Sequence, residues 1–377
     1  MSHPRRQVAP HDVALALLSI NPLPLLLAPA TVPGLFFVWR NLMAQPKSTT
    51  PGQRPALRLV STKSMNREEW LKIRKQGIGA SDAAAAVGIS PYQSPLELWM
   101  IKTGRDGLLP APDPDDIQSP MYWGTLLEPK VAEAYARITG NKVRRVNAVL
   151  QHPDDDKPWM LANLDYAVVG NDDVQILECK TTGQYGAKLW ADGVPEYIQC
   201  QVQHQLAVTG KQAADVAVLI CGQELQIHRI ERDEALIAHL YELEREFWQF
   251  VEANTPPDPD GSDSAGQALQ ALYPRDQGES VDLSANPAME GDFNELLDLR
   301  NTLGRLNERE STLKQRIQQT MGLASKATFT EGSVTWKRSK DSTSLDTKAL
   351  LQDQPGLLKQ YPKHRAGSRR FLVRPNP

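Results

Sequence analysis

Apolar positions between residues 66 and 253 follow two different periods along the chain. In some segments they recur every three or four residues, as in an amphipathic helix, and in others they form short runs or alternate with polar residues, as in strands. The pattern predicts helices at 66–76, 81–88, 94–104, 121–140, 194–210 and 233–253, and strands within 142–153, 159–169, 174–182 and 215–230. Because these helices would flank a sheet of about five strands, we expect an α/β fold with layered helices and sheet.

Capping residues support several of these helix boundaries. Ser94 is followed by Pro95 and then, three residues after the cap, by Glu97, which makes a capping box with proline at the first helical position. Ser81 is expected to cap the alanine-rich helix that follows it. Gly140 is expected to end the helix that begins near residue 121.

The chain changes character after residue 254. Residues 254–266 have the composition of a linker, rich in Pro, Gly, Asp and Ser. Further on, apolar residues recur at spacings of three, four and seven, which predicts a long helix with a coiled-coil-like seam. The seam residues are Leu296, Leu299, Leu303, Leu306, Leu313 and Ile317. Glu310 interrupts the seam, and a helix packed on its own domain fits the pattern as well. A β-hairpin turning at Glu331–Gly332 should follow.

The N-terminal segment requires a separate interpretation. Residues 13–39 are apolar and follow two arginines, as in a signal or anchor segment. Four prolines interrupt the run, however, and no A-x-A-like cleavage site follows it. We therefore expect residues 1–42 to be an extension upstream of a natural start near Met43, or disordered, with an anchor as the alternative. The polar residues 43–64 should form a flexible lead-in. Residues 1–60 are thus assigned to a disordered or non-native N-terminal extension. The remaining predicted parts are a main domain over 61–254, a linker over 255–290 and a basic accessory region over 291–377.

Charge and cysteine content narrow the class of protein only moderately. The net charge of −3 over 377 residues is uninformative, but the stretch from Val334 to the end carries ten Lys and Arg against three Asp. This basic stretch suits contact with nucleic-acid phosphates, although a solvated basic surface explains it equally well. The three cysteines, Cys179, Cys200 and Cys221, are scattered and form no CxxC. They argue against a disulfide framework, a zinc site or an iron–sulfur cluster, and favour a reduced, cytoplasmic setting.

The segment from residue 163 to 182 carries the chemistry of greatest interest. Glu178 and Lys180 lie two apart on a predicted strand, so both point to one face among apolar neighbours. Asp165 lies on the preceding strand across a turn, and strand pairing can bring it beside Glu178. Two carboxylates held close together repel unless a cation lies between them. Oxygen ligands favour Mg²⁺, or Mn²⁺, and the backbone carbonyl of Cys179 offers a further one. A simple Glu178–Lys180 ion pair, with Asp165 as a turn residue, fits this short pattern equally well.

Other segments supply further candidates for the same site. Glu128 is expected in the first turn of its helix, where the helix dipole alone would favour a carboxylate. Gln201 and Gln205 lie four apart and so share one helical face. Arg74 and Ser81 flank a glycine-containing turn, and an arginine beside a helix start is a natural anion pocket. Ser81 as a helix cap alone is the alternative.

Five motifs taken together resemble a known family. "WLKIRKQGIGASDAAAAVGISPYQSPLELWMIKTG", "YWGTLLEPKVAEAY", "NLDYAVV", "ILECKTT" and "YIQCQVQHQLAVTG" occur in the order seen in YqaJ-like viral recombinases. These belong with phage lambda exonuclease in the PD-(D/E)xK nuclease superfamily, and the resemblance covers roughly residues 66–250. It implies a restriction-endonuclease-like core, a mixed β-sheet flanked by helices, with the helix and hairpin as a C-terminal extension. Asn163-Leu164 stands where the superfamily name has proline, a departure common in these enzymes.

The resemblance also implies roles for individual residues. Asp165 and Glu178 would bind the metal with the Cys179 carbonyl, and Glu128 would reach that ion or a second one. Lys180 would orient or help to activate the attacking water, and Gln201 would support the site from its helix, with weaker support for Gln205. Arg74 and Ser81 would hold a 5′-phosphate.

The activity implied is that of an alkaline-type 5′–3′ deoxyribonuclease that uses Mg²⁺, with Mn²⁺ as an alternative. It would degrade one strand of duplex DNA from the 5′ end and leave 3′ single-stranded tails for phage-type recombination. Its partners would be double-stranded DNA ends, a single-strand annealing protein and further copies of itself, a trimeric ring being one arrangement, and no membrane. The alternatives are an end-independent endonuclease or repair nuclease of the same superfamily, and a catalytically inactive DNA-binding scaffold.

Overall fold

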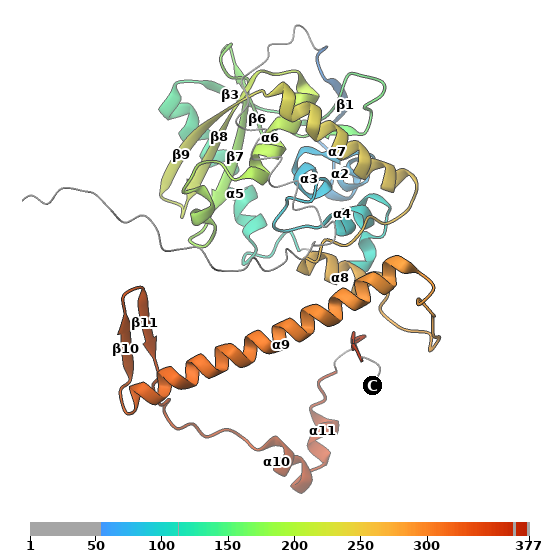
Figure 1. Cartoon of the computed structure of the whole chain (residues 1–377). Helices are drawn as coiled ribbons and strands as arrows, with labels where there is room; N and C mark the ends of the chain where they lie inside the picture. The colour runs from blue at the N-terminus through green and yellow to red at the C-terminus, as the bar shows by residue number, and fades with distance from the viewer. Residues whose placement is uncertain (1–53, 112, 365–366, 375–377) are drawn as a thin grey trace, which may run out of the picture. The chain divides into compact units, whose positions relative to one another are not determined.

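The computed structural model describes residues 54–111, 113–364 and 367–374. Its internal contacts divide the chain after Ala271 into an N-terminal and a C-terminal unit, and each is described by itself (Figure 1). The apolar segment 13–39, and with it most of the predicted N-terminal extension, lies outside the described residues. In the part of the chain that is described, no helix combines the length and the apolarity needed to cross a membrane.

A five-stranded mixed sheet forms the centre of the N-terminal unit. In spatial order its strands are β3 (Lys142–Arg145), β6 (Tyr166–Val169), β7 (Ile176–Thr182), β8 (Ala213–Ile220) and β9 (Glu224–Glu231). Strands β7 and β8 are parallel, and the other neighbouring strands are antiparallel. Strand β6 pairs with β7 only as far as Leu177, so among the described strands the end of β7 is paired on one side, by β8.

The two faces of this sheet are covered by different helices (Figure 1). Because successive side chains of a strand point to opposite faces, Leu177 and Cys179 pack with α5 (Pro120–Thr139), whereas Ile176 packs with α6 (Glu196–Thr209). Glu178 and Lys180 share the face of Ile176 and therefore point toward α6. The mixed sheet flanked by helices confirms the predicted fold class.

A second sheet of the same unit consists of four short strands. In spatial order these are β1 (Leu57–Ser61), β4 (Ala148–Gln151), β5 (Met160–Ala162) and β2 (Ile78–Gly79). Two segments predicted as single strands are thus divided between the two sheets, near Val146 and near Leu164. Strand β1 corrects the expected flexible lead-in, because its backbone pairs with β4 from Leu57 opposite Gln151 to Ser61 opposite Ala148. Backbone groups make this pairing, so the polar composition of the segment does not prevent it.

The remaining helices of this unit surround the second sheet and the first part of α6. They are α2 (Arg67–Arg74), α3 (Ala80–Ala86), α4 (Pro95–Lys102), α7 (Glu234–Glu252) and α8 (Asp263–Leu272), with short 3₁₀ turns at Asp106–Leu108 and Gly186–Trp190. Half of the predicted capping box of α4 is present, since the Ser94 hydroxyl accepts a hydrogen bond from the Glu97 N–H at 3.1 Å. The other half is not, because the Ser94 N–H donates to Ser264 and not to the Glu97 carboxylate. Gly140 ends α5 at φ +73°, as expected.

The predicted cap of one helix and the predicted first-turn position of Glu128 in another are wrong. Helix α3 begins at Ala80 with Gly79 as its cap, because the Asp82 carboxylate, three residues after Gly79, accepts the Gly79 N–H at 3.0 Å. Ser81 is therefore not the cap. Helix α5 begins at Pro120, capped by Ser119, so Glu128 lies in the middle of the helix rather than in its first turn. The helix dipole thus does not explain a carboxylate at this position.

Helix α8 lies in the segment whose composition predicts a linker. The hydroxyl of Ser264 accepts a hydrogen bond from the Ser94 N–H at 2.9 Å and donates one to Glu97 at 2.5 Å. The start of α8 is thereby joined to the start of α4. Ser94 and Ser264 are 170 positions apart, so the composition of the segment around Ser264 could not predict these contacts.

The C-terminal unit contains the long helix and the hairpin that the pattern predicts. Its elements are α9 (Pro287–Met321), β10 (Lys326–Phe329), β11 (Gly332–Thr335), α10 (Thr347–Asp353) and α11 (Gly356–Gln360). Phe329 pairs with Gly332, so the hairpin turns at Thr330–Glu331, one residue earlier than predicted.

A buried ion pair joins α6 to α7. His204 Nδ1 of α6 lies 2.7 Å from Glu244 Oε1 of α7, and His204 Nε2 donates to the Leu161 carbonyl of β5 at 2.9 Å. Both side chains are fully buried. Burial by itself would lower the pKa of His204, but the Glu244 charge and these hydrogen bonds outweigh it and raise the pKa above its ordinary value.

We expect Glu244→Gln to destabilise the protein by about 3 kcal/mol at pH 6, because it leaves a buried charge without its partner. A raised folded-state pKa gives stability that is fully present below the ordinary histidine pKa of about 6.5 and is lost as the pH rises through the folded value. The deficit should therefore shrink at pH 9. Denaturant unfolding at both pH values measures it, with Glu242→Gln, an exposed position of the same helix, as control. A deficit that grows with pH would contradict the assignment.

Candidate active site

The candidate site lies at the part of β7 after Leu177, which β6 does not pair with. Asp165 precedes β6, and its Oδ2 accepts a hydrogen bond from the Cys179 N–H at 2.9 Å. The N–H and C=O of one strand residue point to the same side, so the Cys179 carbonyl also faces Asp165. Strand pairing thus brings Asp165 to the residues that follow Leu177, as the sequence predicts.

The Glu178 carboxylate is the most heavily hydrogen-bonded group of the site. Lys180 Nζ and Gln201 Nε2 donate to its Oε1 at 2.7 and 2.6 Å, and Gln205 Nε2 donates to its Oε2 at 2.8 Å. Lys180 also donates to Gln201 Oε1 at 3.0 Å. Both glutamines come from the face of α6 that lies over β7. Gln205, which the family resemblance supports less than Gln201, therefore contacts Glu178 as directly as Gln201 does.

Burial and like charge disturb the ionisation of these groups. Burial, followed by the neighbouring Glu178 charge, raises the pKa of Asp165 to about 8. Burial alone would lower the pKa of Lys180, but the charges of Glu178 and Asp165 reverse this and raise it. Lys180 is therefore a firmly protonated cation, whereas the charge of Asp165 requires another positive group nearby.

Glu128 approaches this cluster from the other face of the sheet. It belongs to α5, and its Oε1 lies 3.2 Å from Arg145 Nη2 of β3. Burial raises its pKa, and the Glu178 charge adds to that effect, so the two carboxylates sense each other. Glu128 does not line the pocket that holds Asp165 and Glu178. The structure thus brings Glu128 near the cluster electrostatically, while its nearest charged partner is Arg145.

The groups around Asp165 suit a hard divalent cation. Asp165 and Glu178 offer carboxylate oxygens, and the Cys179 carbonyl faces the same place, which is a donor set suited to Mg²⁺ or Mn²⁺. Burial and the Glu178 charge both raise the pKa of Asp165, and a cation bound beside the two carboxylates would offset both effects. Among the described residues, no group of three or more His, Cys, Asp and Glu side chains is arranged to hold an ion. Water would therefore have to complete the coordination, as is usual for Mg²⁺.

A second cluster surrounds the guanidinium of Arg74. Its Nη2 donates to the Ser81 hydroxyl at 2.7 Å and forms an ion pair with Asp82. Lys102, whose side chain is only 2% exposed, donates to Asp82 at 2.7 Å and to the Arg74 carbonyl at 2.8 Å. The Arg74 guanidinium also lies over the Trp70 ring, 4.8 Å from its centroid. Two cations thus share one carboxylate, and the cluster keeps a net positive charge.

The presence of two cations beside one carboxylate determines how Asp82 ionises. Burial by itself would raise the pKa of Asp82, but the charges of Arg74 and Lys102 outweigh it and hold the pKa well below its usual range. Burial lowers the pKa of Lys102. Sequence reasoning did not single out Asp82 or Lys102, although a carboxylate directly after Ser81 was a signal.

Two glycines allow the backbone to place this cluster. A side chain at Gly77 would put its Cβ 2.3 Å from the Trp159 carbonyl oxygen, so the chain passes directly against the strand segment at β5. A Cβ at Gly79 would lie 3.1 Å from Arg74 Nη2 and 3.2 Å from Asp82 Oδ2. Neither position leaves ordinary room for a side chain.

The two clusters line one pocket of about 220 Å³. Its walls are Trp70, Arg74, Gly79, Ala80, Ser81, Asn163, Asp165, Glu178, Lys180 and Gln201. The predicted anion-binding pair and the predicted metal-binding pair are therefore parts of a single site, which combines two carboxylates and a lysine with an arginine. Such a pocket can hold a phosphate group between a positive end and a cation bound by the carboxylates.

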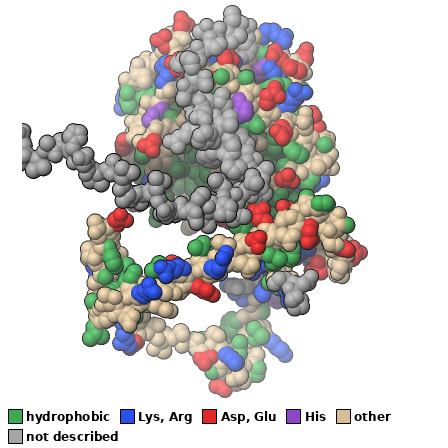
Figure 2. Space-filling model, in the orientation of Figure 1, with side chains coloured by type: hydrophobic (Ala, Val, Ile, Leu, Met, Phe, Trp, Pro, Cys, Tyr) green, Lys and Arg blue, Asp and Glu red, His purple; other side chains and the backbone are tan. Residues whose placement is uncertain are grey.

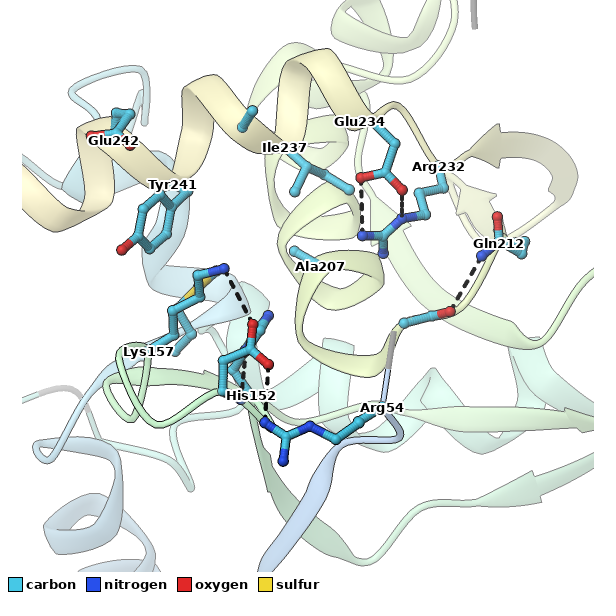
Figure 3. A pocket seen from close by; sticks show the side chains of 14 residues that line it. Arg54, His152, Lys157, Ala207, Gln212, Arg232, Glu234, Ile237, Tyr241 and Glu242 are labelled. Carbon is cyan, nitrogen blue, oxygen red and sulfur yellow. Dashed lines mark hydrogen bonds and ion pairs between the residues drawn. The ribbon is translucent and has the colours of Figure 1, made fainter. Parts of the chain in front are cut away.

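A larger cavity of about 500 Å³ lies elsewhere in the same unit, beside α7 (Figure 3). Its cations lie next to carboxylates: Arg54 and Lys157 are 3.4 and 3.5 Å from Asp154, and Arg232 is 2.6 Å from Glu234. This internal compensation leaves little field to attract an anion, so we place the chemistry in the smaller pocket.

We expect Asp82→Asn to destabilise the protein by about 3 kcal/mol, because Lys102 would be left buried beside Arg74 without a counter-charge. Asp82→Asn combined with Lys102→Met should recover part of the loss, since the orphaned cation is removed. Denaturant unfolding of the two variants at neutral pH measures both effects. A double variant no more stable than Asp82→Asn alone would show that the Asp82–Lys102 pair is not the source.

Comparisons with known proteins identify the family of this chain. Residues 69–212 match the model of the YqaJ-like viral recombinase domain. The uncharacterized protein YqaJ of Bacillus subtilis (strain 168) is 34% identical over 321 residues, which are 84% of this chain and 97% of that one. A crystal structure of an alkaline exonuclease, LHK-Exo, from Laribacter hongkongensis is 26% identical, covers 50% of this chain and 93% of its own, and superposes with a TM-score of 0.41. Since the match to YqaJ spans almost that whole relative, the chain belongs to the family of YqaJ-like viral recombinases.

Proposed function

We propose that this protein is a metal-dependent nuclease that hydrolyses phosphodiester bonds of DNA. The observation that carries the proposal is the shared pocket, which Asp165, Glu178 and Lys180 line together with Arg74 and Ser81. Paired carboxylates with a lysine suit hydrolysis of a phosphodiester, and an arginine beside a hydroxyl suits the binding of a phosphate. Family membership supports the same chemistry.

Each side chain has a distinct part in this mechanism. Asp165, Glu178 and the Cys179 carbonyl would hold Mg²⁺ or Mn²⁺, with Glu128 close enough to influence the ion electrostatically. When bound, such an ion lowers the pKa of water and neutralises charge on the phosphate. Lys180 is protonated, so it acts by orienting the attacking water and by stabilising negative charge on the phosphate oxygens. Gln201 and Gln205 fix Glu178 so that its oxygens keep their direction.

The Arg74 cluster supports cleavage that starts at a 5′ end. A terminal phosphate carries more charge than a bridging one, and the cluster has two cations for one carboxylate. Arg74 is held by Asp82 and Ser81 with its guanidinium at the pocket, 19% exposed. A 5′-phosphate bound there would place an adjoining phosphodiester toward Asp165 and Glu178. The product would be duplex DNA with a 3′ single-stranded tail.

A single-stranded 3′ tail is the substrate of an annealing protein, which we propose as a partner in phage-type recombination. Double-stranded DNA ends are the proposed substrate, and a homo-oligomer such as a trimeric ring would keep the enzyme on the duplex. The basic stretch after Val334 offers charge for such contacts.

We expect Asp165→Asn and Glu178→Gln each to reduce cleavage of linear duplex DNA roughly a thousandfold or more, because each removes ligand charge while keeping shape. Lys180→Ala should slow cleavage severely as well. The rates are measured with and without Mg²⁺, and unfolding curves confirm that the variants fold. Metal-dependent activity near that of the wild type in Asp165→Asn or Glu178→Gln would rule out the metal site.

The 5′-phosphate pocket predicts a preference between DNA ends. The wild type should digest 5′-phosphorylated duplex faster than 5′-hydroxyl duplex, and Arg74→Ala should reduce that ratio roughly tenfold, in line with the loss of a charge-assisted hydrogen bond. Arg105→Ala is a matched control, since Arg105 also lies over a tryptophan but does not line the pocket. Equal rates on both substrates in the wild type would mean that Arg74 does not select the end.

Covalently closed circular duplex distinguishes the remaining activities. An end-dependent exonuclease leaves it intact in Mg²⁺ while it digests the linear form. Cleavage of both would identify an endonuclease or repair nuclease, and cleavage of neither in Mg²⁺ or Mn²⁺ would identify a DNA-binding scaffold.

A further inference from the structure

Helix α9 carries an exposed apolar stripe that only Glu310 interrupts between Leu296 and Ile317. Leu299, Leu303, Leu306 and Leu313 are 43–59% exposed, and they lie on one side of a helix of 35 residues. At 1.5 Å per residue, this helix is about 52 Å long. Figure 2 shows hydrophobic side chains next to charged ones along it. A long exposed apolar stripe on an otherwise polar helix marks a contact surface.

The stripe has the spacing of a two-helix seam. The core positions alternate at intervals of three and four residues, as the a and d positions of a heptad do. The a positions are Leu296, Leu303, Glu310 and Ile317, and the d positions are Leu299, Leu306, Leu313 and Thr320. The charged residues on either side of this seam decide which partner helix fits.

A parallel copy of the same helix fits poorly. In a parallel pair each a position meets its own counterpart, so Glu310 would face a second Glu310 in the core. Flanking positions g and e′ would also meet. Glu295 would lie against Arg300, which is complementary, but Arg309 would lie against Lys314 on both sides of the pair, next to the buried Glu310 layer. Like charges at these sites oppose association.

An antiparallel copy fits well in one register. If Leu303 faces Leu306 of the second helix, then Leu296 faces Leu313, and four leucine–leucine layers form in total. Glu310 then faces a leucine, Leu299, instead of a second glutamate. Its carboxylate is already 2.7 Å from Lys314 Nζ within its own helix, so its charge is compensated.

The flanking charges support the same register. Glu295 lies opposite Arg316 of the second copy at both ends of the pair, which gives two complementary contacts. The other flanking pairs are Thr302 with Arg309, Arg300 with Asn307, and Phe293 with Lys314, and none combines like charges. Sliding one helix by a heptad brings Arg309 onto Arg309 in one direction and Arg300 onto Arg300 in the other.

We propose that α9 is a self-association surface, through which two copies of this chain pair antiparallel with Glu295 of each opposite Arg316 of the other. The surface contains no residue of the candidate active site, so this pairing does not depend on the chemistry proposed for the pocket.

Cysteine cross-linking in the full chain tests the orientation. In a Cys221→Ser background, which removes the one exposed cysteine, Glu295→Cys and Arg316→Cys variants are prepared and oxidised separately and after mixing. The antiparallel pair predicts a covalent dimer in the mixture and little in either variant alone, because identical positions lie roughly 30 Å apart along the seam. Cross-linking of Glu295→Cys to itself, or no cross-link in the mixture, would overturn the proposal.

Charge reversal tests the register. Glu295→Arg or Arg316→Glu alone should weaken self-association roughly tenfold or more, and the combined variant should restore it, measured as an association constant by analytical ultracentrifugation. Glu308→Arg, on the outer side of the helix, is the matched control and should change little. Single variants that behave like this control, or a combined variant without recovery, would contradict the pairing.

Discussion

The site depends on the burial of one carboxylate. Glu178 is 3% exposed, and a lone charge at that depth would be strongly unfavourable. Lys180 on its own strand and two glutamines of α6 make the burial tolerable, and they do so only if α6 lies over β7 in this register. The chemistry of the site and the docking of α6 on the sheet are thus one constraint. A shift of α6 by a single residue would remove both glutamines from Glu178.

The pocket is built from two charge clusters of opposite sign. At one end, two carboxylates are near one lysine, and at the other, two cations share Asp82. The charges within each cluster do not cancel. The excess of carboxylates gives the first cluster an affinity for a cation, and the excess of cations gives the second an affinity for an anion. A phosphate bound between them together with a divalent cation satisfies both ends at once. Neither cluster would be expected in a pocket that only stabilises the fold.

The parts of this site that local patterns specify were predicted from the sequence, and the parts that long-range contacts specify were not. Alternation along β7 placed Glu178 and Lys180 on one face, and helical spacing placed Gln201 and Gln205 together. The opposite face taken by Glu128 depends on how α5 packs, which no local pattern encodes. Asp82 was missed because its partner Lys102 lies 20 residues away and a buried lysine is not recognisable in sequence. The long strands were also divided, because their two ends belong to different sheets.

The close passage of Gly77 against the Trp159 carbonyl has a consequence for how this site can vary. The spacing between the arginine and the carboxylates is set there, by contact of main chain with main chain and not by any side chain of either cluster. Exchanges among the charged residues would therefore alter what the pocket binds without altering its span. A methyl group at position 77 would do the reverse, moving an intact anion site away from an intact pair of carboxylates.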